Sequence, residues 1–171
     1  KNGWLPDYSK TPWKMAIMCG HNTANWRAAG TRFRETVLAN LETIVTMTPD
    51  MSVTAMYADY VLPVAHHYER HDITMEGRTP YLQVLDQAVP PLGESTDDFD
   101  IMARLAKAIS DKASARKLAP IKDSFYGQPI EHDYTKLHDL LTLDGKIRDT
   151  RDIVQLLLDN SSGIPKISYA E

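Results

Sequence analysis

The chain has 171 residues, of which 43% are apolar and 25% are charged, and its formal net charge is −4. This length and composition suit one globular domain with an extension. The small negative charge gives no reason to expect nucleic acid or an anionic membrane surface as a partner. No apolar run approaches the ~20 residues of a membrane-spanning helix. The opening residues, Lys1–Pro6, do not form a signal peptide and are typical of the middle of a protein, so we expect a longer parent.

Cys19 is the only cysteine in the sequence. A single thiol excludes an internal disulfide framework, a cysteine-rich zinc site and an iron–sulfur cluster held by this chain alone. Because Cys19 follows the apolar run 15–18, we expect it to be a small buried side chain.

The first part of the chain alternates between strand and helix signals. The apolar run 13–20 ends at a glycine, which predicts a strand buried on both faces. A turn through Asn22 then leads into a segment with helical spacing. The predicted buried stripe of this segment is Phe33, Val37, Leu38 and Leu41.

Two more strands are predicted before residue 65. Residues 43–48 are rich in β-branched side chains, Ser52 is suited to cap a short helix that ends at Ala58, and residues 60–64 form the third strand. This alternation is typical of βαβ units with a parallel sheet, whose ligands bind beyond the carboxyl ends of the strands. We therefore expect the loops after Cys19, Met47 and Val64 to lie at one common edge.

Further strand and helix signals follow downstream. Residues 81–85 predict a strand, and residues 97–114 predict a long helix with Ser95 as its N-cap and Asp98 three residues later. The predicted buried stripe of this helix is Phe99, Met102, Leu105, Ala106 and Ile109.

The regular pattern of strands and helices ends at Leu118, where an irregular stretch begins. Two short helices are expected there, at residues 134–141 and 149–159. The predicted organisation is a lead-in over residues 1–12, an α/β domain over residues 13–117 and a helical or irregular extension over residues 118–171.

The residues alone suggest several kinds of catalytic or ligand site. His66, His67, His71 and Asp72 include a spacing that could hold zinc, but the segment lacks helical periodicity, so we expect solvated or hydrogen-bonded histidines. The sequence has no recognisable nucleophile motif and no glycine-rich phosphate-binding fingerprint. On the pattern alone, the strand-end loops form a ligand edge of unknown specificity or a set of ordinary turns.

A longer motif favours a ligand-binding edge over a set of ordinary turns. Residues 48–63 contain a threonine-bearing helix that leads into Ala-Asp-Tyr-Val-Leu-Pro at Ala58–Pro63, and a Gly-x-Asn turn at Gly20–Asn22 precedes it. Glu69, then Glu76–Arg78, then Pro91–Glu94 running into an acidic helix start follow in order. These pieces, over about residues 15–109, resemble the pterin-cofactor-binding region of the DMSO reductase family of molybdopterin oxidoreductases.

The segment Tyr68–Asp72 resembles the corresponding segment in one subgroup of this family. That subgroup contains nitrate, selenate, chlorate and perchlorate reductases and dimethylsulfide, ethylbenzene and steroid side-chain dehydrogenases. The resemblance implies a Rossmann-like three-layer α/β sandwich with a mostly parallel sheet. It also implies a molybdenum ion held by two molybdopterin guanine dinucleotides (bis-MGD) in the parent catalytic subunit. The implied partners are the remainder of that subunit and an iron–sulfur electron-transfer subunit, at the periplasmic or cytoplasmic face of a membrane.

The resemblance also implies cofactor-binding positions. Asn22 stands at the turn asparagine that contacts the dinucleotide, and Met47 and Thr48 stand at positions that meet it largely through backbone. Arg70 stands where relatives often carry lysine, and either cation suits phosphate or ribose oxygens. Asp98 matches an aspartate that can accept two N–H donors from guanine. The competing roles are an asparagine turn for Asn22, a solvated side chain for Arg70 and helix capping for Asp98.

The sequence departs from the family pattern in one turn, where Thr23 replaces the usual proline. The cluster cysteines, the metal-ligating residue and the second cofactor-binding domain lie outside the chain, so no catalytic or metal-binding residue is assigned. We expect the isolated chain to be inactive and to bind no cofactor. The alternative is a stand-alone Rossmann-like binding or structural module without redox activity.

Overall fold

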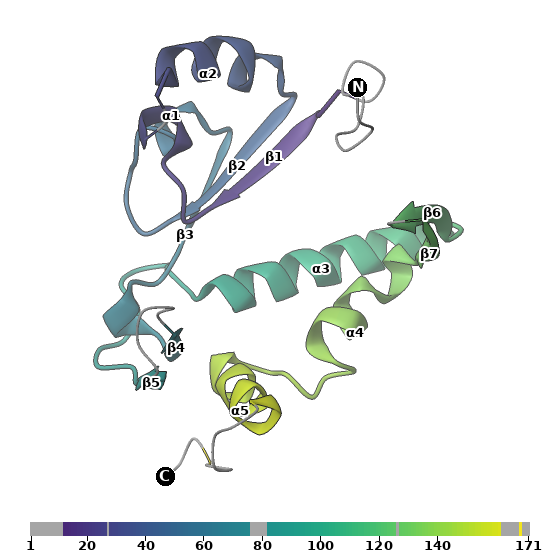
Figure 1. Cartoon of the computed structure of the whole chain (residues 1–171). Helices are drawn as coiled ribbons and strands as arrows, with labels where there is room; N and C mark the ends of the chain where they lie inside the picture. The colour runs from purple at the N-terminus through teal and green to yellow at the C-terminus, as the bar shows by residue number, and fades with distance from the viewer. Residues whose placement is uncertain (1–11, 27, 76–81, 126, 162–167, 169–171) are drawn as a thin grey trace. The chain divides into compact units, whose positions relative to one another are not determined.

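The computed structural model describes residues 12–26, 28–75, 82–125, 127–161 and 168 (Figure 1). The chain divides into Lys1–Val64, here called unit 1, and Ala65–Glu171, here called unit 2. Each unit is described by itself. The domain limits expected from the sequence (residues 1–12, 13–117 and 118–171) stay a prediction. Two predictions concern residues outside the described ranges: most of the lead-in and the motif Glu76–Arg78.

Unit 1 is built on a parallel sheet. Its strands are β1 (Met15–Cys19), β2 (Thr43–Thr48) and β3 (Tyr60–Pro63), in the order β1-β2-β3. All three strand predictions and the parallel pairing are confirmed. The run 43–48 makes the central strand because its β-branched side chains suit a position between two neighbours.

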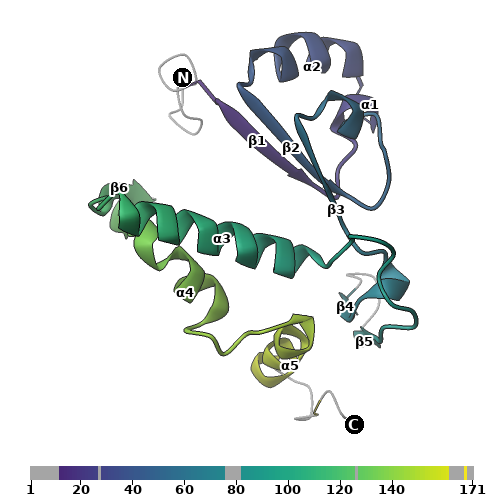
Figure 2. The ribbon, with the colours of Figure 1, turned by 180° about the vertical axis from the view of Figure 1, so that it is seen from behind.

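The helices of unit 1 lie on one face of this sheet (Figures 1 and 2). They are α1 (Thr23–Trp26), α2 (Gly30–Thr36) and the 3-10 helix η1 (Leu38–Asn40). The predicted stripe is therefore divided between two helices. Its members Phe33, Leu38 and Leu41 pack with Ala24 and Ile44 in the core.

Two predictions about burial in β1 are wrong. Met15 and Ile17 are 53% and 41% exposed, and Cys19 is also exposed. The strand is therefore not buried on both faces, and Cys19 is not a buried side chain. The physical reason is alternation: within the described residues α1, α2 and η1 cover the side of Ala16 and Met18, and the odd-numbered residues point away from it.

The short helix after β2 is a 3-10 helix, η2 (Ala55–Tyr57), whose N-cap is Thr54 rather than the predicted Ser52. The Ser52 hydroxyl accepts the Ala55 N–H at 3.2 Å. The chain then enters β3 through Ala58 and Asp59.

Unit 2 contains the long helix α3 (Asp98–Ala115), which confirms the predicted helix, but its cap differs. Asp97 is the N-cap and accepts the Asp100 N–H at 2.8 Å, whereas Ser95 donates its hydroxyl to the Leu92 carbonyl. The predicted buried stripe is confirmed in part. Ala106 is buried and Phe99, Leu105 and Ile109 are half-buried, whereas Met102 is 39% exposed. The other buried residues of the helix are Ile101, Ser110 and Ala113.

The remaining elements of unit 2 are small. The strands β4 (Asp72–Met75) and β5 (Leu82–Leu85) pair antiparallel, and β5 confirms the strand predicted near residue 82. A second hairpin, β6 (Ile121–Phe125) with β7 (Gln128–His132), occupies a stretch expected to be irregular. The 3-10 helices are η3 (His67–Glu69) and η4 (Tyr134–Lys136).

Both short helices expected in the extension are present, as α4 (Leu137–Thr142) and α5 (Thr150–Asn160). Figures 1 and 2 show α4 beside α3, with the β6–β7 hairpin near one end of α3. In the part of the chain that the structure describes, none of the helices is both long and apolar enough to cross a bilayer.

Candidate functional site

The carboxyl ends of the three parallel strands form one edge of the unit 1 sheet. Cys19 is level with Met47, and Thr48 is level with Pro63. Gly20 continues β1 with a φ of +62°, a conformation that favours glycine, and its N–H donates to the Met47 carbonyl at 3.5 Å. The carboxyl ends of the three strands therefore lie at one edge, as predicted, and the loops after Cys19 and Met47 begin there; the loop after Val64 belongs to unit 2.

Asn22 in the first of these loops is held by a residue of the second loop. Its Oδ1 accepts both the backbone N–H and the hydroxyl of Thr54, at 3.1 and 3.0 Å. The Thr54 hydroxyl in turn accepts the Ala24 N–H at 3.0 Å, and Thr54 is fully buried. This contact joins two loops that are 32 residues apart in the chain. The family motif includes a threonine in this segment, but the sequence alone assigns no role to Thr54.

Met47 and Thr48 end β2 at the same edge. Met47 is 2% exposed as a whole residue, and its carbonyl accepts the Gly20 N–H. The Thr48 hydroxyl is engaged with Asp50: it donates to Asp50 oxygens at 3.0 and 3.1 Å and lies 3.4 Å from the Asp50 nitrogen. The structure therefore leaves the Met47 side chain buried and the Thr48 hydroxyl paired within its own loop.

Arg70 and Asp98 meet in unit 2. The Arg70 Nη1 donates to Asp98 Oδ2, and its Nη2 lies 2.9 Å from Asp72 Oδ2. The Arg70 side chain is 16% exposed, whereas the two carboxylates are 37% and 36% exposed. Asp98 is the first residue of α3, where the helix dipole favours an anion. The structure thus brings together two of the predicted site residues and adds Asp72.

The buried guanidinium of Arg70 is incompletely satisfied. Within the described residues, its Nε has no hydrogen-bond partner although the atom is buried. A buried donor without an acceptor costs stability, so this atom marks a place where an acceptor oxygen would be favourable.

The histidines after β3 act as structural groups. The His66 side chain accepts the Glu69 N–H, and Glu69 returns a bond to the His66 backbone, which makes a capping box for η3. His71 Nδ1 lies 2.7 Å from Asp86 Oδ1, and its Nε2 accepts from Arg151 Nε at 3.0 Å. No metal-binding group of three or more acidic, histidine or cysteine residues occurs among the residues that the structure describes.

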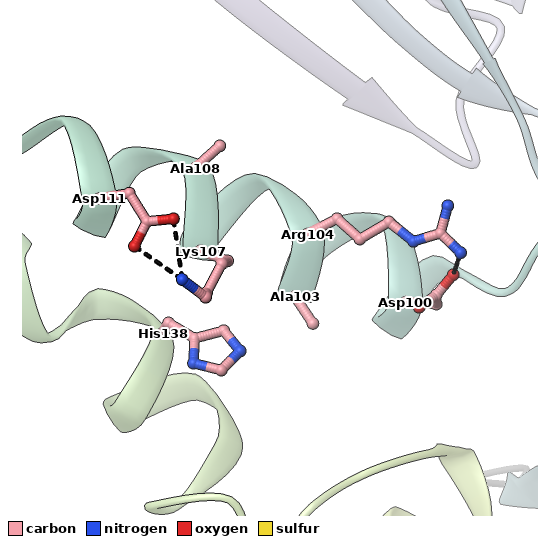
Figure 3. A pocket seen from close by; sticks show the side chains of 7 residues that line it. All are labelled: Asp100, Ala103, Arg104, Lys107, Ala108, Asp111 and His138. Carbon is pink, nitrogen blue, oxygen red and sulfur yellow. Dashed lines mark hydrogen bonds and ion pairs between the residues drawn. The ribbon is translucent and has the colours of Figure 1, made fainter.

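A polar hollow of about 410 Å³ lies between α3 and α4 (Figure 3). Figure 3 shows that its charged side chains are paired, Lys107 with Asp111 and Arg104 with Asp100. His138 from α4 points toward the same space. Because each cation has a carboxylate partner, the hollow has little net charge with which to hold an anion.

An apolar hollow of about 320 Å³ lies in unit 1 beside Trp13, Val37 and Leu41. Trp13 precedes β1, so this hollow is at the end of the sheet opposite to Asn22. Neither hollow coincides with the strand-end edge.

Hydrogen bonds change the pKa values of several charged side chains near the surface. The hydrogen bond from Arg148 lowers the pKa of Asp152, and the hydrogen bond from the Thr135 hydroxyl lowers the pKa of Asp133. The hydrogen bond to Glu42 raises the pKa of Lys14. These groups sit on the surface, where such pairs contribute to helix ends and loops rather than to chemistry.

Comparison with known proteins agrees with the sequence motif. The family model for molybdopterin oxidoreductase matches residues 4–108. The dimethylsulfide dehydrogenase alpha subunit of Rhodovulum sulfidophilum is 31% identical over 92% of this chain. The chlorate reductase alpha subunit of Ideonella dechloratans is 31% identical over 99% of it.

A solved structure has a similar fold. Acetylene hydratase from Pelobacter acetylenicus matches with a TM-score of 0.51 and 29% identity, over 57% of this chain and 14% of that one. The chain spans only 17% and 18% of the two alpha subunits. The match to the family model and the similarity to the two alpha subunits show that this chain belongs to the molybdopterin oxidoreductase family.

Proposed function

We propose that the chain supplies part of the binding surface for one molybdopterin guanine dinucleotide in the catalytic subunit of a molybdenum-dependent oxidoreductase. In unit 1 the contacts come from Asn22, Met47 and Thr48, and in unit 2 they come from Arg70 and Asp98. The observation that carries the proposal is the parallel strand edge, at which Asn22 is held in place by a buried neighbour. Edges of this kind are where open α/β sheets bind nucleotides.

The chemistry of these groups fits such a ligand. The buried Arg70 Nε is a donor with no partner among the described residues, and phosphate or ribose oxygens are acceptors. The Asp98 carboxylate is an acceptor, and the guanine edge carries N–H donors. When bound in the parent, the cofactor supplies the redox-active molybdenum, while the residues of this chain bind and orient the dinucleotide.

The kind of catalytic subunit to which the chain belongs is also part of this proposal. Relatives include alpha subunits named as dimethylsulfide dehydrogenase and as chlorate, perchlorate and respiratory nitrate reductases. We propose that this chain works with the remainder of such a catalytic subunit and with an iron–sulfur electron-transfer subunit. By itself the chain is then inactive, because positioning a cofactor supplies no electrons.

Calorimetric titration with guanosine diphosphate (GDP) tests the proposal on the whole chain. Although the isolated chain is not expected to retain the whole cofactor, we expect it to bind GDP weakly. Adenosine diphosphate (ADP) should bind more weakly still, because Asp98 accepts guanine N–H groups that adenine lacks. Asp98→Asn replaces one carboxylate oxygen with a donor and should raise the Kd for GDP about tenfold or more. Asp100→Asn is the matched control: Asp100 lies in the same helical turn but pairs with Arg104 and Thr96.

Two results would contradict the proposal. The first is no heat with GDP. The second is binding that Asp98→Asn and Asp100→Asn weaken equally, since that would show a general effect of charge at the start of α3. A folded chain that binds neither nucleotide would favour a structural module.

A further inference from the structure

The Asn22–Thr54 contact determines which end of the Asn22 amide is available. A backbone N–H can only donate, so the amide atom facing the Thr54 nitrogen must be the oxygen. The Asn22 oxygen therefore points to Thr54, and the Asn22 NH2 group points elsewhere. Within the described residues no group pairs with that NH2.

The Thr54 hydroxyl is itself fully committed. It accepts the Ala24 N–H, so its own hydrogen is directed to Asn22 Oδ1. Thr54 is 0% exposed, and water does not compete for these bonds. Rotation of the Asn22 amide by half a turn would place its NH2 against the Thr54 backbone N–H, one donor facing another, which is unfavourable.

We propose that Thr54 is a positioning residue that makes Asn22 a hydrogen-bond donor toward the ligand. The ligand must then place an acceptor oxygen, from its diphosphate, ribose or guanine carbonyl, beside Asn22. This inference rests on the proposed function and adds the polarity of one contact to it. It also assigns a role to Thr54, a residue that contacts no ligand itself.

Asn22→Asp is the sharpest test, because it separates support from recognition. A carboxylate still accepts both Thr54 donors, so the urea midpoint of unit 1 should not fall. The donor is lost and a negative charge faces the acceptor oxygen, so the Kd for GDP should rise about tenfold or more. Guanosine, titrated in parallel, identifies the acceptor: a phosphate oxygen gives a large loss with GDP only, and a ribose or guanine oxygen gives a loss with both.

Two substitutions at Thr54 test the positioning role. Thr54→Val keeps the shape and removes the hydroxyl, so it should weaken GDP binding by a similar factor. Thr54→Ser retains the hydroxyl and should restore affinity to within about threefold of the original. The nuclear magnetic resonance signals of the Asn22 NH2 report the contact directly: they should shift with GDP in the original chain and in Thr54→Ser, but not in Thr54→Val.

The outcomes separate this inference from the proposed function. GDP binding that Asn22→Asp leaves unchanged overturns the donor role of Asn22 while the nucleotide site stands. Normal binding by Thr54→Val, with an unchanged Asn22 NH2 shift, overturns the positioning role of Thr54. Absence of GDP binding by the original chain overturns the proposed function and this inference together.

Discussion

Asp59 and Ile44 exchange two hydrogen bonds at the point where β2 and β3 begin to pair. Asp59 Oδ2 accepts the Ile44 N–H at 2.8 Å, and the Asp59 N–H donates to the Ile44 carbonyl at 2.9 Å. The aspartate of the family motif therefore acts within the sheet: it caps the start of the central strand and sets the register of its neighbour.

Removing this carboxylate should destabilise unit 1. We expect Asp59→Ala to lower the free energy of unfolding by about 1.5–3 kcal/mol, because the lost bond has a charged acceptor. Asp59→Asn should retain most of the stability, since its side-chain oxygen can still accept. Tryptophan fluorescence in urea measures this, because all three tryptophans precede Val64 and report on unit 1. Equal losses for the two variants would contradict the assigned hydrogen bond.

The buried hydroxyl of Thr46 offers a stabilising change in the same strand. Thr46 is 1% exposed, and its Oγ1 has no hydrogen-bond partner among the described residues. Thr46→Val has the same shape without the unsatisfied hydroxyl and should raise the stability of unit 1 by about 1 kcal/mol. Thr43→Val, at the partly exposed start of β2, is the control and should change stability by less. A stability loss in Thr46→Val would indicate that the hydroxyl is satisfied.

Adjacent substitutions before α2 should have opposite signs. A Cβ at Gly30 would lie 2.6 Å from the Ala24 carbonyl oxygen, so Gly30→Ala should cost about 1–3 kcal/mol through crowding against backbone. Ala29 has a φ of 75°, which is strained for alanine, so Ala29→Gly should stabilise by up to about 1 kcal/mol. The same fluorescence assay reads both. Shifts of the urea midpoint in the same direction would show that the α1–α2 connection is not packed as described.

In unit 2, two arginines differ in burial and should differ in their effect. Arg70 is 16% exposed and contacts two carboxylates, so Arg70→Met should lower stability by about 1–3 kcal/mol. Arg104 is 73% exposed, and Arg104→Met should change stability by about 0.5 kcal/mol or less. Circular dichroism at helical wavelengths follows unit 2, because α3 and α5, with 18 and 11 residues, exceed the helices of unit 1. Similar losses for both variants would contradict the structural role of Arg70.

Acid titration should reveal the lowered pKa of Asp152, which is paired with Arg148. The hydrogen bond from the Arg148 side chain holds the pKa of Asp152 below its ordinary value of 3.8, followed by the bond from the Arg148 backbone. The stabilisation is complete above 3.8 and is lost as the pH falls through the lowered folded-state pKa. Carboxyl resonances should give a midpoint below 3.8 for Asp152, and Arg148→Gln should move it upward. An unchanged midpoint in that variant would assign the shift to another group.

Much of the secondary structure of unit 1 follows from local pattern. The β-branched run at 43–48 forms the central strand with the predicted bounds, and the order of strands and helices predicts the parallel pairing that is observed. Local pattern was less informative about burial. Cys19 was expected to be buried because it follows an apolar run, yet it is exposed because it lies on the face of β1 opposite α1, α2 and η1.

The sequence motif and the tertiary structure each contribute to defining the candidate site. The sequence by itself located Asn22, Met47, Thr48, Arg70 and Asp98 through a family motif, and parallel strands dictate that the loops of unit 1 share an edge. Their roles as nucleotide contacts stay a prediction. Only the tertiary structure decided the partners of the polar side chains: Thr54 for Asn22, and Asp98 with Asp72 for Arg70. The physical reason is that periodicity reports neighbours within a few residues, whereas these bonds, apart from the one to Asp72, join residues that lie 32 and 28 positions apart.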